Sequence, residues 1–431
     1  MSDGQLTSPP GTHDVLSPAS RLWEFLIGTF ANEARRYGFG LIVSPMFEDV
    51  AVFHRGIGEQ SDVARKEMYT FTDRGERTYA LRPEGTASVV RAFVQHNPTP
   101  PWKAWYATPA FRYERPQAGR YRQHHQVGVE ALGSDDPYID VEVISLAWRF
   151  YEAIGLRRIT LMVNSMGHAE CRAEFVELLT AYFEENETRL CDEHTKVWST
   201  NPLRVLDCKK DSCVSLVQEG PTLPASLCAE CRDHFAVVTA GLDALEIPWT
   251  ANPNLVRGFD YYTRTTFEFA SDALANAQNA IGGGGRYDRL AEDLGGSPTP
   301  GVGFGSGIER LILALEAEES PVVSAVREAG VFAYVVDTTG GLAALTLTSS
   351  LRAAGVSVDR AFDRRSMKSQ LKAADRSGAR WALLIGDQET HGGYVTLRDL
   401  RVGVDGERQY QVPRADVVAH VAELQRKNSE I

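Results

Sequence analysis

The strongest constraint on the fold is a series of short runs, between Met68 and Gly133, in which apolar and polar residues alternate. The runs MYTFTD, YALRP, KAWYATPAFRYE and HHQVGVEALG have the period of two that is typical of half-buried strands. Turn sequences such as DRGER and RPQAGR separate several of them. Because tight turns join antiparallel neighbours, this part of the chain is expected to form an antiparallel sheet of hairpins.

The rest of the chain changes character several times. At 431 residues it is longer than one ordinary core allows, so several domains are expected. Residues 1–165 and 251–325 are predicted to be two parts of one core, separated by a helical, cysteine-bearing insertion at 166–250. Residues 331–431 alternate strand and helix, which indicates a separate α/β domain. The predicted class is α+β: an antiparallel-sheet domain with a helical insertion and a C-terminal α/β domain.

Composition excludes several classes of protein. A net charge of -12 argues against indiscriminate nucleic-acid binding, although it permits a local basic patch. There is no apolar run of about 18 residues and no signal-peptide pattern at the N-terminus, so we expect a cytoplasmic protein without membrane spans. The six cysteines cluster between Cys171 and Cys231, which favours reduced thiols or a metal site over a disulfide framework.

Four arginines occur within twelve residues of the stretch FRYERPQAGRYRQHHQVGVE: Arg112, Arg115, Arg120 and Arg122. Guanidinium groups match phosphate oxygens in pairs and keep their charge, so a hairpin that gathers them suits a triphosphate. The alternative is a solvated hairpin whose arginines pair with carboxylates, and composition alone favours it. The chain has neither GxxxxGK[ST] nor GxGxxG, so a bound nucleotide would have to be held by side chains.

Four further motifs each have an ordinary interpretation. LRPEGT could simply begin a helix, and the tyrosines of LVRGFDYYTRTTFEF could pack in a strand. The glycines of IGGGGRYD could form a flexible turn or allow close approach of a ligand. In GVGFGSGIERL, Arg310 early in a helix could reach a phosphate or lie on the surface. Pro45, inside the apolar run FGLIVSPMFEDV, indicates an edge or interface strand because proline lacks the N–H that a central strand donates.

The order and spacing of these motifs are more specific than any one of them. YGFGLIVSPMFEDV, FRYERPQAGRYRQHHQVGVE and GVGFGSGIERL resemble motifs 1, 2 and 3 of the class II aminoacyl-tRNA synthetases. LRPEGT, LVRGFDYY and IGGGGRYD resemble signatures of the histidyl-tRNA synthetase family, and the resemblance covers essentially the whole chain. It implies a homodimer formed through motif 1. It also implies ATP- and Mg²⁺-dependent activation of L-histidine to an adenylate, followed by transfer to the 3′ end of tRNA(His).

The resemblance also implies a role for individual residues. Arg112 and Arg257 would be catalytic, Arg112 at the α-phosphate and histidine carboxylate and Arg257 at the charge developing on that phosphate. Glu114 would read the adenine amino group, while Arg120 and Arg310 would hold the outer phosphates.

Other residues would bind histidine and tRNA. Glu84, Thr86 and Gln126 would surround the histidine ammonium, Glu130 and Tyr262 would contact the imidazole nitrogens, and Tyr261 would line the pocket; Arg112 and Arg257 complete the histidine-binding set. Arg115 and Gln117 would meet the tRNA acceptor end, and residues 331–431 would read the anticodon.

Two features depart from the family pattern. Many members have an aromatic residue where this chain has His124, at the position expected to stack on adenine. Cys208, Cys213, Cys228 and Cys231 have the spacing C-x4-C-x14-C-x2-C, which could bind Zn²⁺ tetrahedrally. The resemblance implies no zinc, and ordinary buried thiols are the favoured interpretation.

Two other functions are compatible with parts of this pattern. One is a non-catalytic relative of the family that regulates histidine biosynthesis, and the other is a structural RNA-binding protein. The first is disfavoured because such relatives generally lack the C-terminal domain and have eroded motifs, whereas this chain retains Arg112, Arg257, Arg310 and the full domain.

Overall fold

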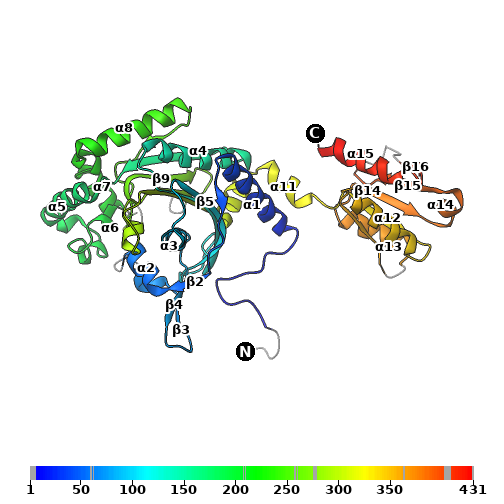
Figure 1. Cartoon of the computed structure of the whole chain (residues 1–431), viewed down its shortest axis with the longest axis horizontal. Helices are drawn as coiled ribbons and strands as arrows, with labels where there is room; N and C mark the ends of the chain where they lie inside the picture. The colour runs from blue at the N-terminus through cyan, green and yellow to red at the C-terminus, as the bar shows by residue number, and fades with distance from the viewer. Residues whose placement is uncertain are drawn as a thin grey trace. The chain divides into compact units, whose positions relative to one another are not determined.

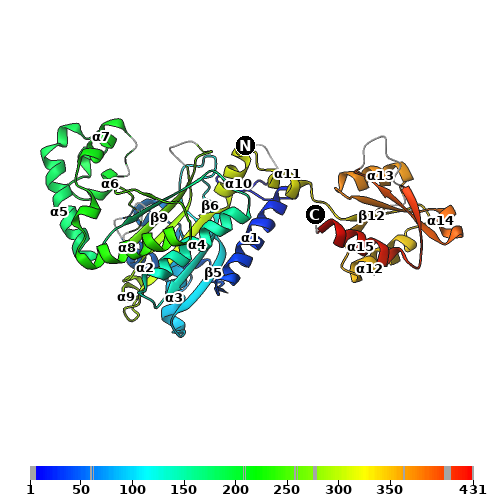
Figure 2. The ribbon, with the colours of Figure 1, turned by 90° about the horizontal axis from the view of Figure 1, so that it is seen from above.

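The chain forms two compact units, Met1–Val323 and Ser324–Ile431, which are considered separately (Figures 1 and 2). The computed structural model describes residues 6–58, 61, 63–206, 208, 210–256, 259, 261–274, 279–362, 365–401 and 409–429. Within these residues, none of the helices combines the length and apolar character needed to cross a bilayer.

An eight-stranded sheet, largely antiparallel as expected from the sequence, forms the centre of the first unit, but the runs MYTFTD and YALRP lie in a second, smaller sheet. Only the outermost pairs of the large sheet, β1 with β5 and β7 with β8, are parallel. In spatial order the strands are β1 (Gly40–Leu41), β5 (Trp102–Phe111), β6 (Gln123–Leu132), β11 (Gly301–Gly307), β10 (Ala280–Arg286), β9 (Thr263–Ser271), β7 (Ile159–Ser165) and β8 (Thr250–Ala251). A separate three-stranded antiparallel sheet contains β2 (Phe47–Asp49), β4 (Thr78–Leu81) and β3 (Thr70–Thr72).

Helices cover both faces of the large sheet, as Figure 1 shows. On strand β5, the ring of Trp105 meets Phe30 of α1, with 6.2 Å between ring centroids, while the adjacent Ala104 and Tyr106 pack with Val89 of α3. Alternate side chains of one strand therefore bury against different helices, as the period of two requires. The helices outside the insertion are α1 (Ala19–Arg36), α2 (Val50–Ile57), the π-helical turn η1 (Val63–Glu67), α3 (Thr86–His96), α4 (Pro137–Ala153), α9 (Leu290–Asp293), α10 (Ile308–Ala317) and α11 (Pro321–Glu328).

The strand expected through Pro45 does not form. Strand β1 ends at Leu41 and β2 begins at Phe47, so Pro45 lies between two short strands. The buried Arg82 side chain satisfies this segment instead: its Nη1 donates to the carbonyls of Ser44 and Pro45, each at 3.1 Å. Nε of Arg82 donates to the carbonyl of Pro109 on β5 at 2.8 Å, which ties the segment to the large sheet.

Between β7 and β8 the chain leaves the sheet and forms the helical insertion. Its own core buries Phe175, Leu179, Phe183, Val205 and Leu216. Only α5 and α8, at its two ends, are long. The elements are α5 (Ala169–Glu185), η2 (Glu187–Arg189), η3 (His194–Lys196), α6 (Leu203–Leu206), α7 (Asp211–Glu219), η4 (Leu223–Ser226) and α8 (Ala229–Ala244).

The second unit is an α/β domain, in agreement with the class expected from the sequence. Its five strands lie in the order β13-β12-β14-β15-β16, the first three parallel and the last two antiparallel to their neighbours. Its elements are β12 (Ala333–Asp337), α12 (Leu342–Ala353), β13 (Val358–Arg360), α13 (Met367–Arg376), β14 (Trp381–Ile385), α14 (Asp387–Gly392), β15 (Tyr394–Asp399), β16 (Gln409–Pro413) and α15 (Val417–Ser429).

Candidate active site

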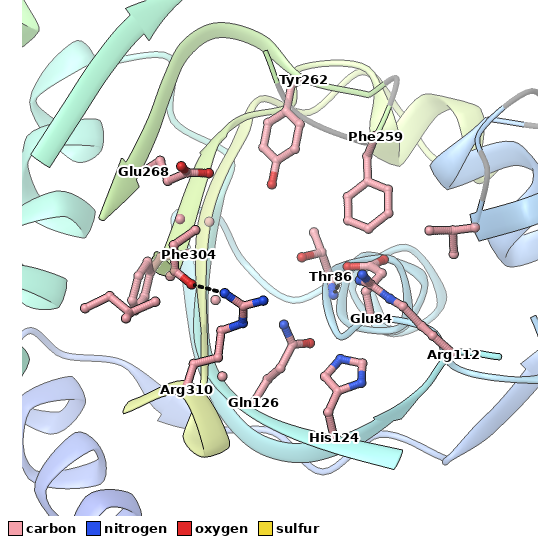
Figure 3. A pocket seen from close by; sticks show the side chains of 18 of the residues that line it. Glu84, Thr86, Arg112, His124, Gln126, Phe259, Tyr262, Glu268, Phe304 and Arg310 are labelled. Carbon is pink, nitrogen blue, oxygen red and sulfur yellow. Dashed lines mark hydrogen bonds between the residues drawn. The ribbon is translucent and has the colours of Figure 1, made fainter. Parts of the chain in front are cut away.

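A cavity of about 770 Å³ opens on the face of the large sheet that carries α3. Strands β6, β9, β10 and β11 and the start of α3 supply its walls, and Figure 3 shows side chains from these distant segments pointing into one space. Most residues singled out from the sequence line it: Glu84, Thr86, Arg112, Glu114, Arg120, His124, Gln126, Tyr261, Tyr262 and Arg310. Arg257 lies outside the residues that the structure describes.

Three arginines, two from the segment between β5 and β6 and one from α10, face this cavity. Arg112 follows strand β5, donates from Nε to the carbonyl of Pro83 at 2.9 Å, and lies over the ring of Phe259. Arg120 lies in the hairpin loop, where its Nε is 2.6 Å from Oε2 of Glu114. Arg310, in the first turn of α10, donates to the carbonyl of Ala280 at 3.0 Å. Each guanidinium group is held by a contact within the protein, so the three are gathered before any ligand arrives.

The electrostatics of the site reflect this gathering of positive charge. Burial, and then the charges of Arg112, Arg120 and Arg310, lower the pKa of His124 to about 3, so its imidazole is neutral at neutral pH. Burial and the charge of Arg120 also lower the pKa of Arg310. Arginines held this close repel one another, so a ligand with several negative charges would relieve that repulsion.

The first turn of α3 carries the polar end of the cavity. The backbone N–H groups of Thr86 and Ala87 donate to the two carboxylate oxygens of Glu84, at 2.8 and 2.7 Å. Burial raises the pKa of Glu84, and these hydrogen bonds partly offset the increase. Glu84 therefore starts the helix and also presents a carboxylate at the cavity wall, beside Arg112 in Figure 3.

Glu130 lies beneath the cavity and is absent from the side chains that line it. Strand β6 buries it completely, and its carboxyl accepts hydrogen bonds from Thr86 Oγ1 at 2.7 Å, from Tyr106 Oη at 3.3 Å and from Tyr287 Oη. Burial raises its pKa to about 8 despite these donors. A Cβ atom added at Gly303 would lie 1.7 Å from Oε2 of Glu130, so only glycine fits above this carboxyl.

Glycines make one wall of the cavity flat. The segment IGGGGRYD is strand β10, not a turn, and Gly282 and Gly283 on it line the cavity together with Gly303 and Gly305 of β11. A Cβ atom at Gly305 would be in van der Waals contact with Gln126 at 3.7 Å, whereas at Gly303 it would meet Glu130. A planar ring can therefore approach the backbone here.

Among the residues of the cavity wall that sequence reasoning missed, three lie close to residues that it named. The ring of Phe259 lies under the guanidinium group of Arg112. The negative charge of Glu268 on β9 favours the charged form of Arg310 and so partly offsets the lowering of its pKa by burial. Glu309 accepts from the backbone N–H of His125 at 3.0 Å. A signal for Glu268 was present: it lies between two phenylalanines in TFEFA, and strand alternation places it on the face opposite theirs. No comparable signal distinguishes Phe259 or Glu309.

The two predicted tRNA contacts, and the four cysteines considered as zinc ligands, lie elsewhere. Arg115 and Gln117 are exposed on the hairpin loop between β5 and β6, outside the cavity. The cysteines are not brought together as their spacing suggested: Cys208 and Cys213 lie in one group, and Cys228 and Cys231 in another. The reason is that each pair has nearer partners, including histidines, that cysteine spacing alone does not reveal.

Comparison with known proteins gives consistent matches over nearly the whole chain. The family described as histidyl-tRNA synthetase matches residues 11–197 and 199–311, and an anticodon binding domain matches residues 324–424. The histidine–tRNA ligase of Moorella thermoacetica is 46% identical over 427 residues, which cover 97% of this chain and 99% of the relative. That of Mycobacterium marinum is 46% identical over 402 residues, covering 93% and 95%.

Among solved structures, the apo histidyl-tRNA synthetase of S. aureus superposes with a TM-score of 0.78. It is 33% identical and covers 97% of this chain and 100% of its own. A Bacillus halodurans protein described as an ATP phosphoribosyltransferase regulatory subunit/histidyl-tRNA synthetase has a TM-score of 0.64 at 18% identity, covering 89% of this chain and 99% of its own. At that identity the likeness concerns the fold alone.

Proposed function

The chain belongs to the histidyl-tRNA synthetase family, and from this premise we infer that it works as a histidine–tRNA ligase. The reaction activates histidine with ATP and transfers it to tRNA. The observation that carries the inference is the convergence of Arg112, Arg120 and Arg310 on one cavity that also has a polar amino-acid pocket. The regulatory relative is less consistent with this chain, which retains both these arginines and an anticodon-binding domain.

We propose that adenylate formation proceeds by positioning and electrostatic stabilisation. A carboxylate oxygen of histidine attacks the α-phosphorus of ATP, the bond to the bridging oxygen breaks, and pyrophosphate leaves with the bonding electrons. Arg112 neutralises charge on the α-phosphate while Arg120 and Arg310 hold the departing phosphates. Mg²⁺ would neutralise the remaining charge. Glu268, whose carboxylate acts electrostatically on Arg310, would be a ligand for that ion. Arg257 would stabilise the charge that develops on the α-phosphate, as the resemblance implies.

The second step transfers the histidyl group to tRNA. A hydroxyl of the terminal ribose attacks the acyl carbon of the adenylate, and AMP leaves. Arg115 and Gln117, which are exposed on the hairpin loop, would contact the acceptor end, and the C-terminal unit would read the anticodon. A cytoplasmic location follows from this partner.

ATP binding would exchange an internal ion pair for ligand contacts. In the structure Arg120 is paired with Glu114 at 2.6 Å. We propose that Arg120 turns to the outer phosphates, which frees Glu114 to accept from the adenine amino group. The neutral ring of His124 stacks on the base, where an uncharged ring avoids repulsion from the neighbouring arginines.

The histidine pocket lies between α3 and the tyrosine pair Tyr261 and Tyr262. We propose that Glu84, Thr86 and Gln126 surround the ammonium group, and that Tyr262 and Glu130 bind the two imidazole nitrogens. Glu130 would reach the ring from beneath the wall, exchanging the hydroxyl of Thr86 for a ring nitrogen. A pocket whose buried polar groups are paired only by imidazole rejects side chains that lack its nitrogens.

A homodimer would be formed through the segment around Pro45. Leu41, Val43, Met46 and Phe47 expose apolar side chains there, with Val43 86% exposed. Such a row on one surface is expected to be covered by a second copy of the chain. The measurement is light scattering of the wild type and of Val43→Asp, which we expect to dissociate; a monomeric wild type would contradict this proposal.

Histidine-dependent exchange of pyrophosphate into ATP tests the proposed function. We expect exchange in the wild type and a loss of about 100-fold or more in Arg310→Ala, because a fixed positive charge in a water-poor site stabilises the transition state strongly. Arg149→Ala is the matched control, since Arg149 pairs with Glu152 on the exposed side of α4. Histidine binding without exchange in pure wild-type protein would identify a regulatory protein and refute the ligase function.

A further inference from the structure

All six cysteines lie in the insertion, and the structure gathers them with two histidines into two groups. The first group, called site A, contains His168, Cys171, Cys228 and Cys231; the second, called site B, contains Cys191, His194, Cys208 and Cys213. We propose that each group binds one Zn²⁺, so that the insertion is held by two structural zinc ions. Neither site contains the four cysteines that spacing alone would group.

The distances suit tetrahedral zinc. Ligand atoms about 2.3 Å from a central ion stand about 3.8 Å apart in a tetrahedron. Within each site all four ligand atoms lie within 4.8 Å of one another. In site A, Nε2 of His168 is 3.4 Å from Sγ of Cys228, and in site B, Sγ of Cys191 is 4.0 Å from Sγ of Cys208. The six cysteines are free, and that sulfur separation is far above the roughly 2.05 Å of a disulfide.

Site A is built from the starts of two long helices. His168 caps α5 and Cys171 lies in its first turn; Cys228 caps α8 and Cys231 lies in its first turn. Backbone N–H groups already point at the sulfurs: that of Cys228 donates to Cys171 Sγ at 3.2 Å, and that of Cys231 donates to Cys228 Sγ at 3.4 Å. Such donors and the positive ends of two helices favour thiolates, the form that binds metal.

The histidine of site A has a suitable outer partner. Its Nε2 faces the sulfurs, while its Nδ1 lies 3.1 Å from Oε2 of Glu170 and 3.4 Å from the backbone N–H of Cys171. Metal binding through Nε2 requires the proton on Nδ1, which would then donate to Glu170; the contact in which the backbone N–H of Cys171 donates to Nδ1 would be given up. A carboxylate that orients a ligating imidazole in this way is a usual feature of zinc sites.

Site B repeats this arrangement on the short elements inside the insertion. Cys191 and His194 are three residues apart, as are His168 and Cys171, and Sγ of Cys191 is 3.0 Å from Nδ1 of His194. The backbone N–H of Cys191 donates to Sγ of Cys213 at 3.3 Å, and that of Lys210 donates to Sγ of Cys208 at 3.4 Å. His194 is only 6% exposed, so its ring is held against the sulfurs by the surrounding core.

The insertion is the part of the chain that most needs such cross-links. Between Glu187 and Ser226 the longest helix, α7, has nine residues, and helices this short are marginal without tertiary support. Site A joins the entry of the insertion to its exit, across 57 residues between Cys171 and Cys228. Site B fastens the short helices in the middle. Four protein ligands leave no open position on the ion, so both sites are structural and not catalytic.

Metal analysis of the full-length protein, purified without an affinity tag, tests the proposal. We expect two zinc ions per chain in the wild type, one in Cys171→Ser/Cys231→Ser, and one in Cys191→Ser/Cys213→Ser. His391→Ala, which changes an exposed histidine of the C-terminal unit, should keep two. Folded wild-type protein with fewer than two zinc ions, after expression and refilling in excess Zn²⁺, would overturn the proposal.

Cobalt titration keeps the proposal testable if the cysteine variants do not fold. After chelation, the wild type should take up two equivalents of Co²⁺, with thiolate-to-metal charge transfer and the visible bands of tetrahedral sulfur-rich coordination. Octahedral spectra, or saturation at one equivalent, would contradict two Cys₃His sites. Limited proteolysis of the metal-free protein should cut first between residues 187 and 228. Neither readout uses enzymatic activity, so its outcome is independent of the proposed ligase function.

Discussion

Replacing Glu130 with glutamine should remove a pH dependence from the stability of the catalytic unit. The carboxyl is completely buried on β6, and three hydroxyl groups, on Thr86, Tyr106 and Tyr287, are within hydrogen-bonding distance. Burial nevertheless raises its pKa from 4.5 to about 8. At neutral pH the folded protein therefore keeps a proton that the unfolded chain has released, whereas glutamine is neutral in both states.

The sign and size follow from proton linkage. Between pH 4.5 and 8 the unfolded state binds fewer protons at Glu130 than the folded state, so the free energy of unfolding decreases as pH rises. The contribution is fully present below pH 4.5 and is lost by about pH 8. At about 1.4 kcal/mol per pH unit, the whole interval corresponds to about 5 kcal/mol, and the step from pH 5.5 to 7.5 to about 3 kcal/mol.

Urea unfolding of wild type and Glu130→Gln at pH 5.5 and 7.5 measures this effect. The difference in unfolding free energy between the two proteins should change by about 3 kcal/mol in favour of the variant as pH rises, because all other titrating groups are shared. Glu177→Gln, at an exposed position of α5, is the matched control and should show no such change. A difference that stays constant between the two pH values would refute a protonated, buried Glu130.

Three further substitutions test other parts of the catalytic unit. Arg286→Ala removes the arginine paired with the fully buried Asp140 and should lower the free energy of unfolding by about 3–5 kcal/mol in urea; a loss below 1 kcal/mol would contradict the importance of this pair. His124→Phe should change the KM for ATP by less than about fivefold, since one uncharged ring replaces another. A larger increase would show that the imidazole nitrogens contact ATP directly. Gly303→Ala should lower the free energy of unfolding by about 1–3 kcal/mol and weaken histidine binding measured by calorimetry, because its Cβ would meet the carboxyl of Glu130. An unchanged affinity would show that this glycine does not form part of the histidine pocket.

Local patterns predicted the elements well where one physical rule dominates. Helix α3 covers the whole segment TASVVRAFVQH, because its apolar spacing and the glycine before it leave no competing structure. The Pro45 segment was harder. Proline excludes a central strand, but only the three-dimensional structure shows that the buried Arg82 binds the carbonyls that a neighbouring strand would have bound.

The sequence predicted which residues gather at the site, but not which of them line the cavity and which lie beneath its wall. Motif order placed Arg112 and Arg310 together, and both line one cavity. It could not show that Glu130 lies beneath a glycine wall, since this depends on the pairing of β6 with β11. The histidines of the two proposed zinc sites were missed for a related reason: His168 and His194 each lie three residues from a cysteine, a signal that counting cysteines alone does not detect.

The contacts of Arg82 also connect the exposed apolar row to the cavity. Its guanidinium holds the carbonyls of Ser44 and Pro45, beside the exposed apolar row. The next residue along the chain, Pro83, accepts from Nε of Arg112 inside the cavity. Only one peptide unit therefore separates the anchor of the proposed pairing surface from the anchor of the nucleotide clamp. If a second copy covers that surface, as proposed, a shift of Pro83 on nucleotide binding would be passed to the interface through this single peptide unit, and the affinity of the second site for nucleotide would then depend on the first.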